Sequence, residues 1–157
     1  MRYSLDGITM DIIDGWVDIT DETDGYQPIT LAREDGVGAL QFSVATYVSG
    51  KPPSIDAKAL RAMLLRFVSS EGFRSPLGLT SFERTGTSFA VAEFRKGDVY
   101  LKTWFVSDGM SACHVTYNCL LHHKGQEVDE CDGMVATIRF KRQLNEPACA
   151  GKGGDLQ

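Results

Sequence analysis

The stretch from Leu77 to His123 restricts the fold more than any other part of the sequence. It consists of strand-like runs at residues 78–85, 87–95, 98–107 and 111–122. Short turns separate these runs, and they contain Gly86, Lys96-Gly97-Asp98 and Asp108-Gly109. Glycine-containing turns of two or three residues are the strongest local signal for β-hairpins. The region therefore predicts an antiparallel meander.

The last of these runs has the clearest alternation of side chains. One face carries Cys113, Val115, Tyr117, Cys119 and Leu121, and the other carries Ala112, His114, Thr116, Asn118 and Leu120. Consecutive side chains of a strand point to opposite faces of its sheet. We therefore expect one side of the sheet to pack on helices and the other to be partly solvated.

The first half of the chain predicts further strands. Residues 3–13 alternate weakly and suggest one strand that ends at the turn Asp14-Gly15. A strand around Leu40, Phe42 and Val44 is expected to pair with the strand that contains Ile29 and Leu31. The turn Glu34-Asp35-Gly36 connects the two.

Two segments have the periodicity of helices. The first begins near Lys51-Pro52-Pro53-Ser54, with Ser54 as the predicted N-cap, and ends at Gly72. Its apolar stripe consists of Ile55, Leu60, Met63, Leu64, Phe67 and Val68. The second segment spans residues 125–139, where Val128, Cys131, Val135 and Ile138 recur at helical spacing. The sequence thus predicts an α+β fold in which an antiparallel β-sheet packs against two main helices.

Length and composition are those of one globular domain. The chain has 157 residues, of which 43% are hydrophobic and 24% are charged. We place a single α+β domain at residues 1–142 and a disordered tail at residues 143–157, which is rich in glycine. No run has the roughly 20 apolar residues that a membrane span requires, and the first residues lack the apolar core of a signal peptide. These features predict a cytoplasmic protein that does not bind membranes.

The four cysteines are Cys113, Cys119, Cys131 and Cys149. A chain of this length does not need disulfides for stability, and a cytoplasmic protein is kept reduced. We therefore expect free thiols.

Negative charge is concentrated in the N-terminal segment. Residues 1–35 contain nine acidic and two basic side chains, a balance of −7, whereas the remainder has a balance of +2. One interpretation is a solvated surface with turn-forming aspartates. The other is a negative surface, including Asp18, Asp21, Glu22 and Asp24, that steers a basic protein partner. Either interpretation argues against binding of nucleic acid.

The order of elements resembles the Mog1/PsbP-like fold. The resemblance rests on short motifs over residues 3–140, namely Gly15-Trp16, the run from Tyr100 to Phe105, Thr116-Tyr117-Asn118 and the run from Val135 to Phe140. Known members include a nuclear GTPase-binding protein, a photosystem lumenal subunit and bacterial adaptor chaperones for type VI secretion effectors. The resemblance implies an antiparallel sheet between helices, a function in binding, and no shared catalytic residues.

The sequence offers few groups for catalysis. Cys113 and His114 are neighbours on one strand, so their side chains point to opposite faces and cannot form a nucleophile–base pair. His122 and His123, near Cys119 and Cys131, match no established zinc-ligand spacing. The Gly151-Lys152-Gly153-Gly154 segment lacks the strand and helix of a phosphate loop. We therefore predict no catalytic residues, no metal and no cofactor.

The best candidate for a binding surface is the row His114, Thr116 and Asn118, together with Tyr100 or Trp104 from a neighbouring strand. The alternative is that Tyr100 and Trp104 lie beneath a helix as part of the core. The corresponding function is a non-catalytic protein-binding module, most specifically a bacterial immunity protein that masks a basic toxin. Two alternatives remain: an adaptor for a secreted effector, and a small-molecule-binding or hydrolytic domain that uses the sheet cavity. Self-association into a homodimer is a further option.

Overall fold

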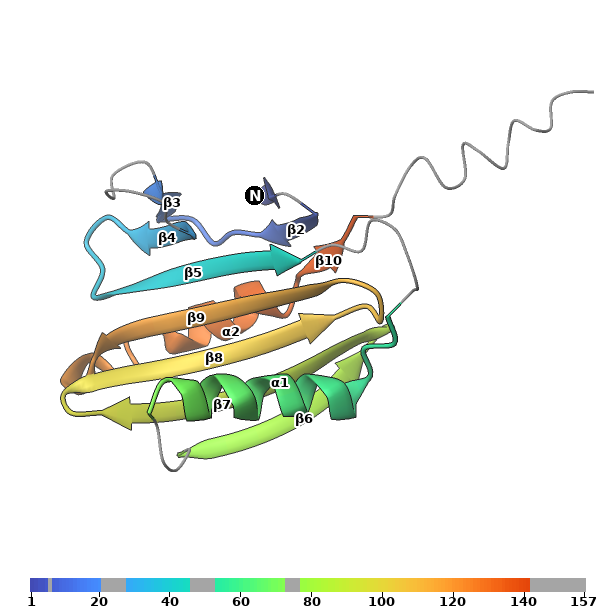
Figure 1. Cartoon of the computed structure of the whole chain (residues 1–157). Helices are drawn as coiled ribbons and strands as arrows, with labels where there is room; N and C mark the ends of the chain where they lie inside the picture. The colour runs from blue at the N-terminus through green and yellow to red at the C-terminus, as the bar shows by residue number, and fades with distance from the viewer. Residues whose placement is uncertain (6, 21–27, 46–52, 73–76, 142–157) are drawn as a thin grey trace, which may run out of the picture.

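The computed structural model describes residues 1–5, 7–20, 28–45, 53–72 and 77–141. Its main feature is a seven-stranded antiparallel sheet with the order β3-β4-β5-β9-β8-β7-β6 (Figure 1). The strands are β3 (Trp16–Asp18), β4 (Ile29–Arg33), β5 (Gly38–Ala45), β6 (Gly78–Arg84), β7 (Thr87–Lys96), β8 (Val99–Ser107) and β9 (Ala112–Leu120). The predicted meander is therefore confirmed as β6 to β9.

The turn chemistry explains why the meander forms. Arg84 pairs with Thr87, so the β6–β7 turn has two central residues, Thr85 and Gly86, with φ angles of 50° and 78°. Positive φ at both positions is the conformation that matches the twist of paired strands. The expected pairing of Ile29 and Leu31 with Phe42 and Leu40 is also present.

Helix α1 (Ala57–Ser70) covers one side of the sheet. It packs on β6, β7 and β8, and its buried residues Leu60, Leu64 and Val68 contact a cluster that includes Phe94 and Phe105. The predicted N-cap at Ser54 is wrong. Asp56 caps the helix, because its Oδ1 accepts a hydrogen bond of 2.8 Å from the amide of Ala59.

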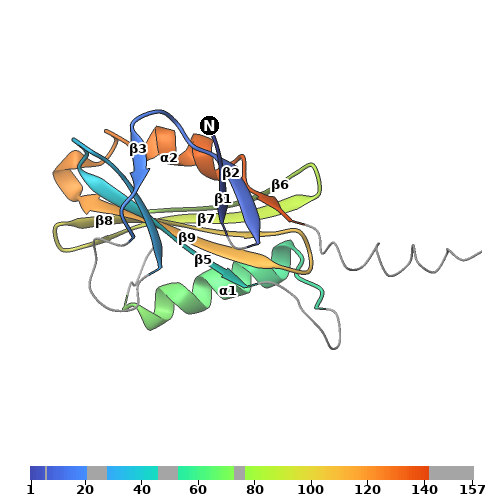
Figure 2. The ribbon, with the colours of Figure 1, turned by 90° about the horizontal axis from the view of Figure 1, so that it is seen from above.

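The other side of the sheet is covered by helix α2 (Val128–Val135) and by a small second sheet (Figure 2). This sheet has the order β1-β2-β10, with β1 (Arg2–Leu5), β2 (Ile8–Asp11) and β10 (Arg139–Phe140). A short 3-10 helix, η2 (Leu121–His123), follows β9. The small sheet and α2 enclose the larger hydrophobic cluster against the central strands.

Two sequence predictions on this side are wrong. Residues 3–13 form a hairpin rather than one strand, because Gly7, with φ of 89°, reverses the chain between β1 and β2. The second helix is shorter than residues 125–139. Thr137 accepts a hydrogen bond from the Asp11 amide, which holds the chain beside β2, and Arg139 and Phe140 then pair with that strand.

The prediction of free thiols is confirmed for the three cysteines in the described part of the chain. Cys113, Cys119 and Cys131 have free, buried thiols. Burial raises the pKa of Cys113 to about 12.

In the part of the chain that the structure describes, neither helix has the length and apolar character needed to cross a membrane. Cys149, the predicted tail and the glycine-rich segment at 151–154 lie outside the described residues.

Candidate functional site

Helix α1 leaves half of its side of the sheet uncovered. The helix packs over β6, β7 and β8, so the same side of β9 and β5 has no described helix above it (Figure 1). On this side of the two strands, most side chains are half-buried or exposed, and most are polar. We call this surface the open polar face, and it consists of Gln41, Ser43, His114, Thr116 and Asn118.

Strand register brings these side chains together. Gln41 lies opposite Thr116, and Ser43 lies opposite His114, in the antiparallel pair of β5 and β9. Because alternate residues of a strand share one face, all five side chains point to the α1 side. The predicted alternation of β9 is confirmed, since Cys113, Val115, Tyr117 and Cys119 are buried on the opposite side.

His114 anchors one end of the open polar face. Its ring stacks on Phe105 at a centroid distance of 4.2 Å and meets the edge of Phe67 at 4.5 Å. Its Nε2 lies 2.8 Å from Oγ1 of the buried Thr103. Burial lowers the pKa of His114 to about 4, so the ring is neutral at physiological pH.

The rest of the face offers hydrogen-bonding groups to a partner. Gln41 donates through Nε2 to Oγ1 of Thr30 at 3.2 Å, and its Oε1 is left to accept. Among the described residues, no hydrogen bond reaches the side chains of Ser43, Thr116 or Asn118. A shallow cavity of about 300 Å³ lies over this face. Its lining includes Pro28, Gln41, Ser43, Phe67, Glu71, Leu101, His114, Thr116 and Asn118.

Tyr100 and Trp104 do not belong to this surface. They lie opposite Cys119 and Val115 in the β8–β9 pair, so they share the other side of the sheet with those residues. Tyr100 is 0% exposed and Trp104 is 2% exposed. Their prediction as exposed contact residues is therefore wrong, and the alternative that they belong to the core beneath a helix is confirmed.

The predicted acidic surface is described only in part. Asp21, Glu22 and Asp24 lie outside the described residues. Asp18 is exposed, and its carboxylate accepts hydrogen bonds from the Tyr3 hydroxyl and the Thr20 amide. Burial opposes ionisation of Asp18, but the hydrogen bonds from Thr20 and Tyr3 outweigh it and lower the pKa. Asp18 therefore also links β3 to β1.

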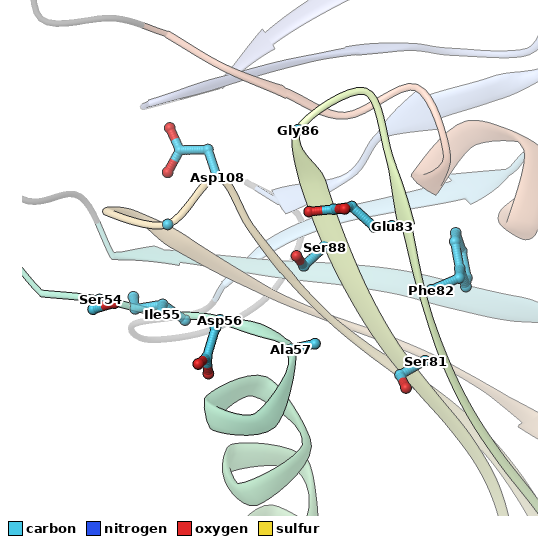
Figure 3. Close-up of a pocket in the computed structure, with 11 residues that line it drawn as sticks. Ser54, Ile55, Asp56, Ala57, Ser81, Phe82, Glu83, Gly86, Ser88 and Asp108 are labelled. Atoms are coloured by element: carbon cyan, nitrogen blue, oxygen red, sulfur yellow. The ribbon is translucent and has the colours of Figure 1, made fainter.

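A second cavity, of about 540 Å³, lies between the start of α1 and the hairpin of β6 and β7 (Figure 3). Asp56, Glu83 and Asp108 contribute carboxylates to its wall. Asp56 caps α1, and Asp108 accepts hydrogen bonds from the amides of Met110 and Ser111. These two carboxylates therefore stabilise local backbone structure. Within the described residues, no three His, Cys, Asp or Glu side chains are grouped to hold a metal ion.

Sequence reasoning missed three carboxylates that join α2 to the sheet. The sequence suggested that the acids of α2 serve the helix dipole, but each of these three accepts specific hydrogen bonds. Glu127 accepts from Tyr117 Oη at 2.9 Å and from the Val37 amide at 3.0 Å. Glu130 and Asp132 bind the two indole N–H groups of the chain, and their spacing from the tryptophans gives no signal in the sequence.

Cys113 and His114 cannot act as a catalytic pair. Cys113 is buried in the cluster beneath α2, whereas His114 contacts Phe67 of α1 on the other side of the sheet. The sequence argument from strand geometry predicted this separation.

Comparison with known proteins identifies the fold. No protein-family model and no curated protein sequence matches the chain. The structure is similar to the solution structure of cyanobacterial PsbP (CyanoP) from Synechocystis sp. PCC 6803, with a TM-score of 0.61 and 13% identity over 90% of this chain and 92% of that chain. It is also similar to a crystal structure from Bacteroides thetaiotaomicron VPI-5482, with a TM-score of 0.57 and 15% identity over 93% of this chain and 54% of that one. The chain thus shares the α+β fold of cyanobacterial PsbP, which is the fold that its sequence motifs suggested.

Proposed function

We propose that this chain is a non-catalytic protein-binding module that holds its partner on the open polar face. The proposal rests on one observation: on the α1 side of the sheet, no described helix covers β5 and β9. A rigid antiparallel pair, β5 and β9, presents Ser43, Thr116 and Asn118 to solvent, and their side-chain hydrogen-bonding groups are unused among the described residues. A rigid platform loses little conformational entropy when a partner binds, which favours its use for recognition.

The chemistry of the face supports binding over hydrolysis. His114 is neutral and is held between Phe67 and Phe105. Its hydrogen-bond partner Thr103 is 0% exposed and also donates to the carbonyl of Val115. A substrate would not reach that hydroxyl. The pair therefore fixes the ring orientation and leaves the polar groups of the face for recognition.

The specific form that we propose is a bacterial immunity protein that masks a basic toxin. The acidic balance of the first 35 residues supports this choice, because a negative surface accelerates association with a basic protein. Within the described part of this segment, Asp14, Glu34 and Asp35 are exposed. They would add to the electrostatic attraction of the basic toxin by Asp18, Asp21, Glu22 and Asp24.

Growth of a bacterial host tests this form. The product of a gene adjacent to this one is expressed alone and together with this chain. We expect the neighbouring product to arrest growth, the wild-type chain to restore it, and Thr116→Lys to restore it less. If the wild-type chain binds the product but growth stays arrested, the immunity role is wrong and an adaptor role is favoured. A small molecule that native mass spectrometry finds on the purified chain would contradict the protein-binding proposal.

A further inference from the structure

The edge strand β6 is open to pairing. The sheets end in four edge strands, and among the described residues these are β1 with four residues, β10 with two, β3 with three and β6 with seven. An unpaired edge exposes a row of N–H and C=O groups that another strand can use. β6 is therefore the edge with the most backbone available for pairing.

β6 also lacks most of the features that protect such edges. Proteins block exposed edges with proline, charged side chains (lysine above all), bulges or very short strands. The charged side chains of β6, Glu83 and Arg84, are opposite in sign and lie at one end of the strand. The sequence from Gly78 to Arg84 has neither proline nor lysine, and its ladder with β7 continues through seven consecutive pairs. Its last five residues are all exposed, so no described part of the chain covers them.

One aromatic side chain on this edge is also exposed. Phe82 is 42% exposed and stacks on Phe89 of β7 at a centroid distance of 4.7 Å, so it is held on the surface of the sheet. In Figure 3, Phe82 and Glu83 extend to opposite sides of β6. A row of backbone groups beside a fixed aromatic ring is suited to an added strand.

We propose that β6 pairs with β6 of a second copy of this chain, in an antiparallel arrangement about a two-fold axis at Phe82. Charge allows a second copy to occupy this edge. The whole chain carries −5, so two copies repel one another over much of their surface, but Glu83 and Arg84 make this strand neutral. Two-fold pairing also uses the same surface on both copies, as closed dimers require.

The register follows from the side chains. An axis at Phe82 places the two Phe82 rings opposite each other, Thr80 opposite Arg84 of the second copy, and Ser81 opposite Glu83 of the second copy. Aromatic pairs stabilise neighbouring strands, whereas like charges that lie directly opposite destabilise them. An axis at Glu83 would place two carboxylates opposite each other. The Phe82 axis avoids this and joins both sheets into one continuous sheet.

Sedimentation velocity of the full chain over a dilution series tests the proposal. We expect the wild type to reach twice the 17.2 kDa mass of one chain and to dissociate on dilution. Thr80→Lys places a lysine opposite Arg84 twice in each dimer, so it should raise the dissociation constant at least about tenfold. Ser81→Lys places a lysine opposite Glu83, so it should leave the dimer intact or strengthen it. The matched control Leu65→Lys, on the exposed face of α1, should have no effect.

A second variant tests the register directly. In Thr80→Lys combined with Arg84→Glu, the opposite charges face each other again, and dimerisation should return. Circular dichroism shows that each variant is folded. The proposal is overturned if the wild type is a monomer at the highest concentration it tolerates, or if Thr80→Lys and Leu65→Lys give the same dissociation constant. It does not depend on the partner of the open polar face, because β6 lies at the far edge of the sheet from β5.

Discussion

Trp16 and Glu130 are 114 positions apart in the sequence, yet the indole Nε1 donates a hydrogen bond of 3.0 Å to the carboxylate Oε1. The same oxygen accepts from Arg33 Nη1 at 2.9 Å. One side chain of α2 thus holds β3 and β4. Asp132, two positions later, also accepts from a tryptophan and a cation, but both lie on β8: Trp104 Nε1 donates to Oδ1 at 3.2 Å and Lys102 Nζ donates to Oδ2 at 2.8 Å.

Removal of the Glu130 carboxylate should destabilise the fold. Trp16 is 5% exposed, so Glu130→Ala leaves a nearly buried N–H group without its acceptor. We expect the free energy of unfolding to fall by about 1–3 kcal/mol in urea titration. Asp129→Ala, in the same helix but exposed, should change it by less than about 0.5 kcal/mol. Equal effects of the two variants would contradict the anchoring role.

Replacing Gly38 and Gly133 by alanine should change the stability of the fold in opposite directions. A Cβ on Gly38 would lie 2.5 Å from the Asn118 carbonyl oxygen and 2.6 Å from the Tyr117 ring, so Gly38→Ala should destabilise by about 1–3 kcal/mol. A Cβ on Gly133 meets nothing within 4 Å, and this residue lies inside α2. Gly133→Ala should therefore stabilise by up to about 1 kcal/mol. Thermal unfolding measures both, and a stabilising Gly38→Ala would be inconsistent with this packing.

His114 should make stability depend on pH. Its pKa is about 4 in the folded chain and near its ordinary 6.5 in the unfolded chain, so the unfolded state takes up a proton first as pH falls. The stabilisation is complete above pH 6.5 and is lost as pH decreases toward 4. Between pH 6.5 and 5 the loss should be about 1.6 kcal/mol. Chemical denaturation at each pH measures it, and His114→Gln should remove most of this slope.

The acidic segment should set the association rate with a basic partner. We expect Asp21→Asn, Glu22→Gln and Asp24→Asn together to slow association about tenfold at low salt, with little change in dissociation. Asp18 is retained in this variant because it accepts hydrogen bonds from Tyr3 and Thr20. The advantage of the wild type should shrink as salt rises. Stopped-flow association rates that are equal for the wild type and the variant at every salt concentration would contradict the steering role. They would favour the interpretation of this segment as a solvated surface.

The sequence predicted the meander, α1 and the alternation of β9, because glycine turns and side-chain periodicity are local signals. It did not predict the shorter α2 or the pairing of β10 with β2, since these depend on contacts between residues distant in sequence, such as Asp11 with Thr137. The position of Trp104 was predictable in principle. With either two or four residues in the β8–β9 turn, Trp104 lies opposite an odd-numbered residue of β9, on the side away from His114.

The affinity of the purified chain for the toxin that we propose as its partner tests the central claim most directly. Isothermal titration calorimetry would compare the wild type with Thr116→Lys combined with Asn118→Lys, and with Gly133→Lys on the opposite side of the molecule. The open polar face predicts a loss of at least about tenfold in affinity for the double variant and wild-type affinity for Gly133→Lys. Wild-type affinity in the double variant, with a loss in Gly133→Lys, would contradict the account.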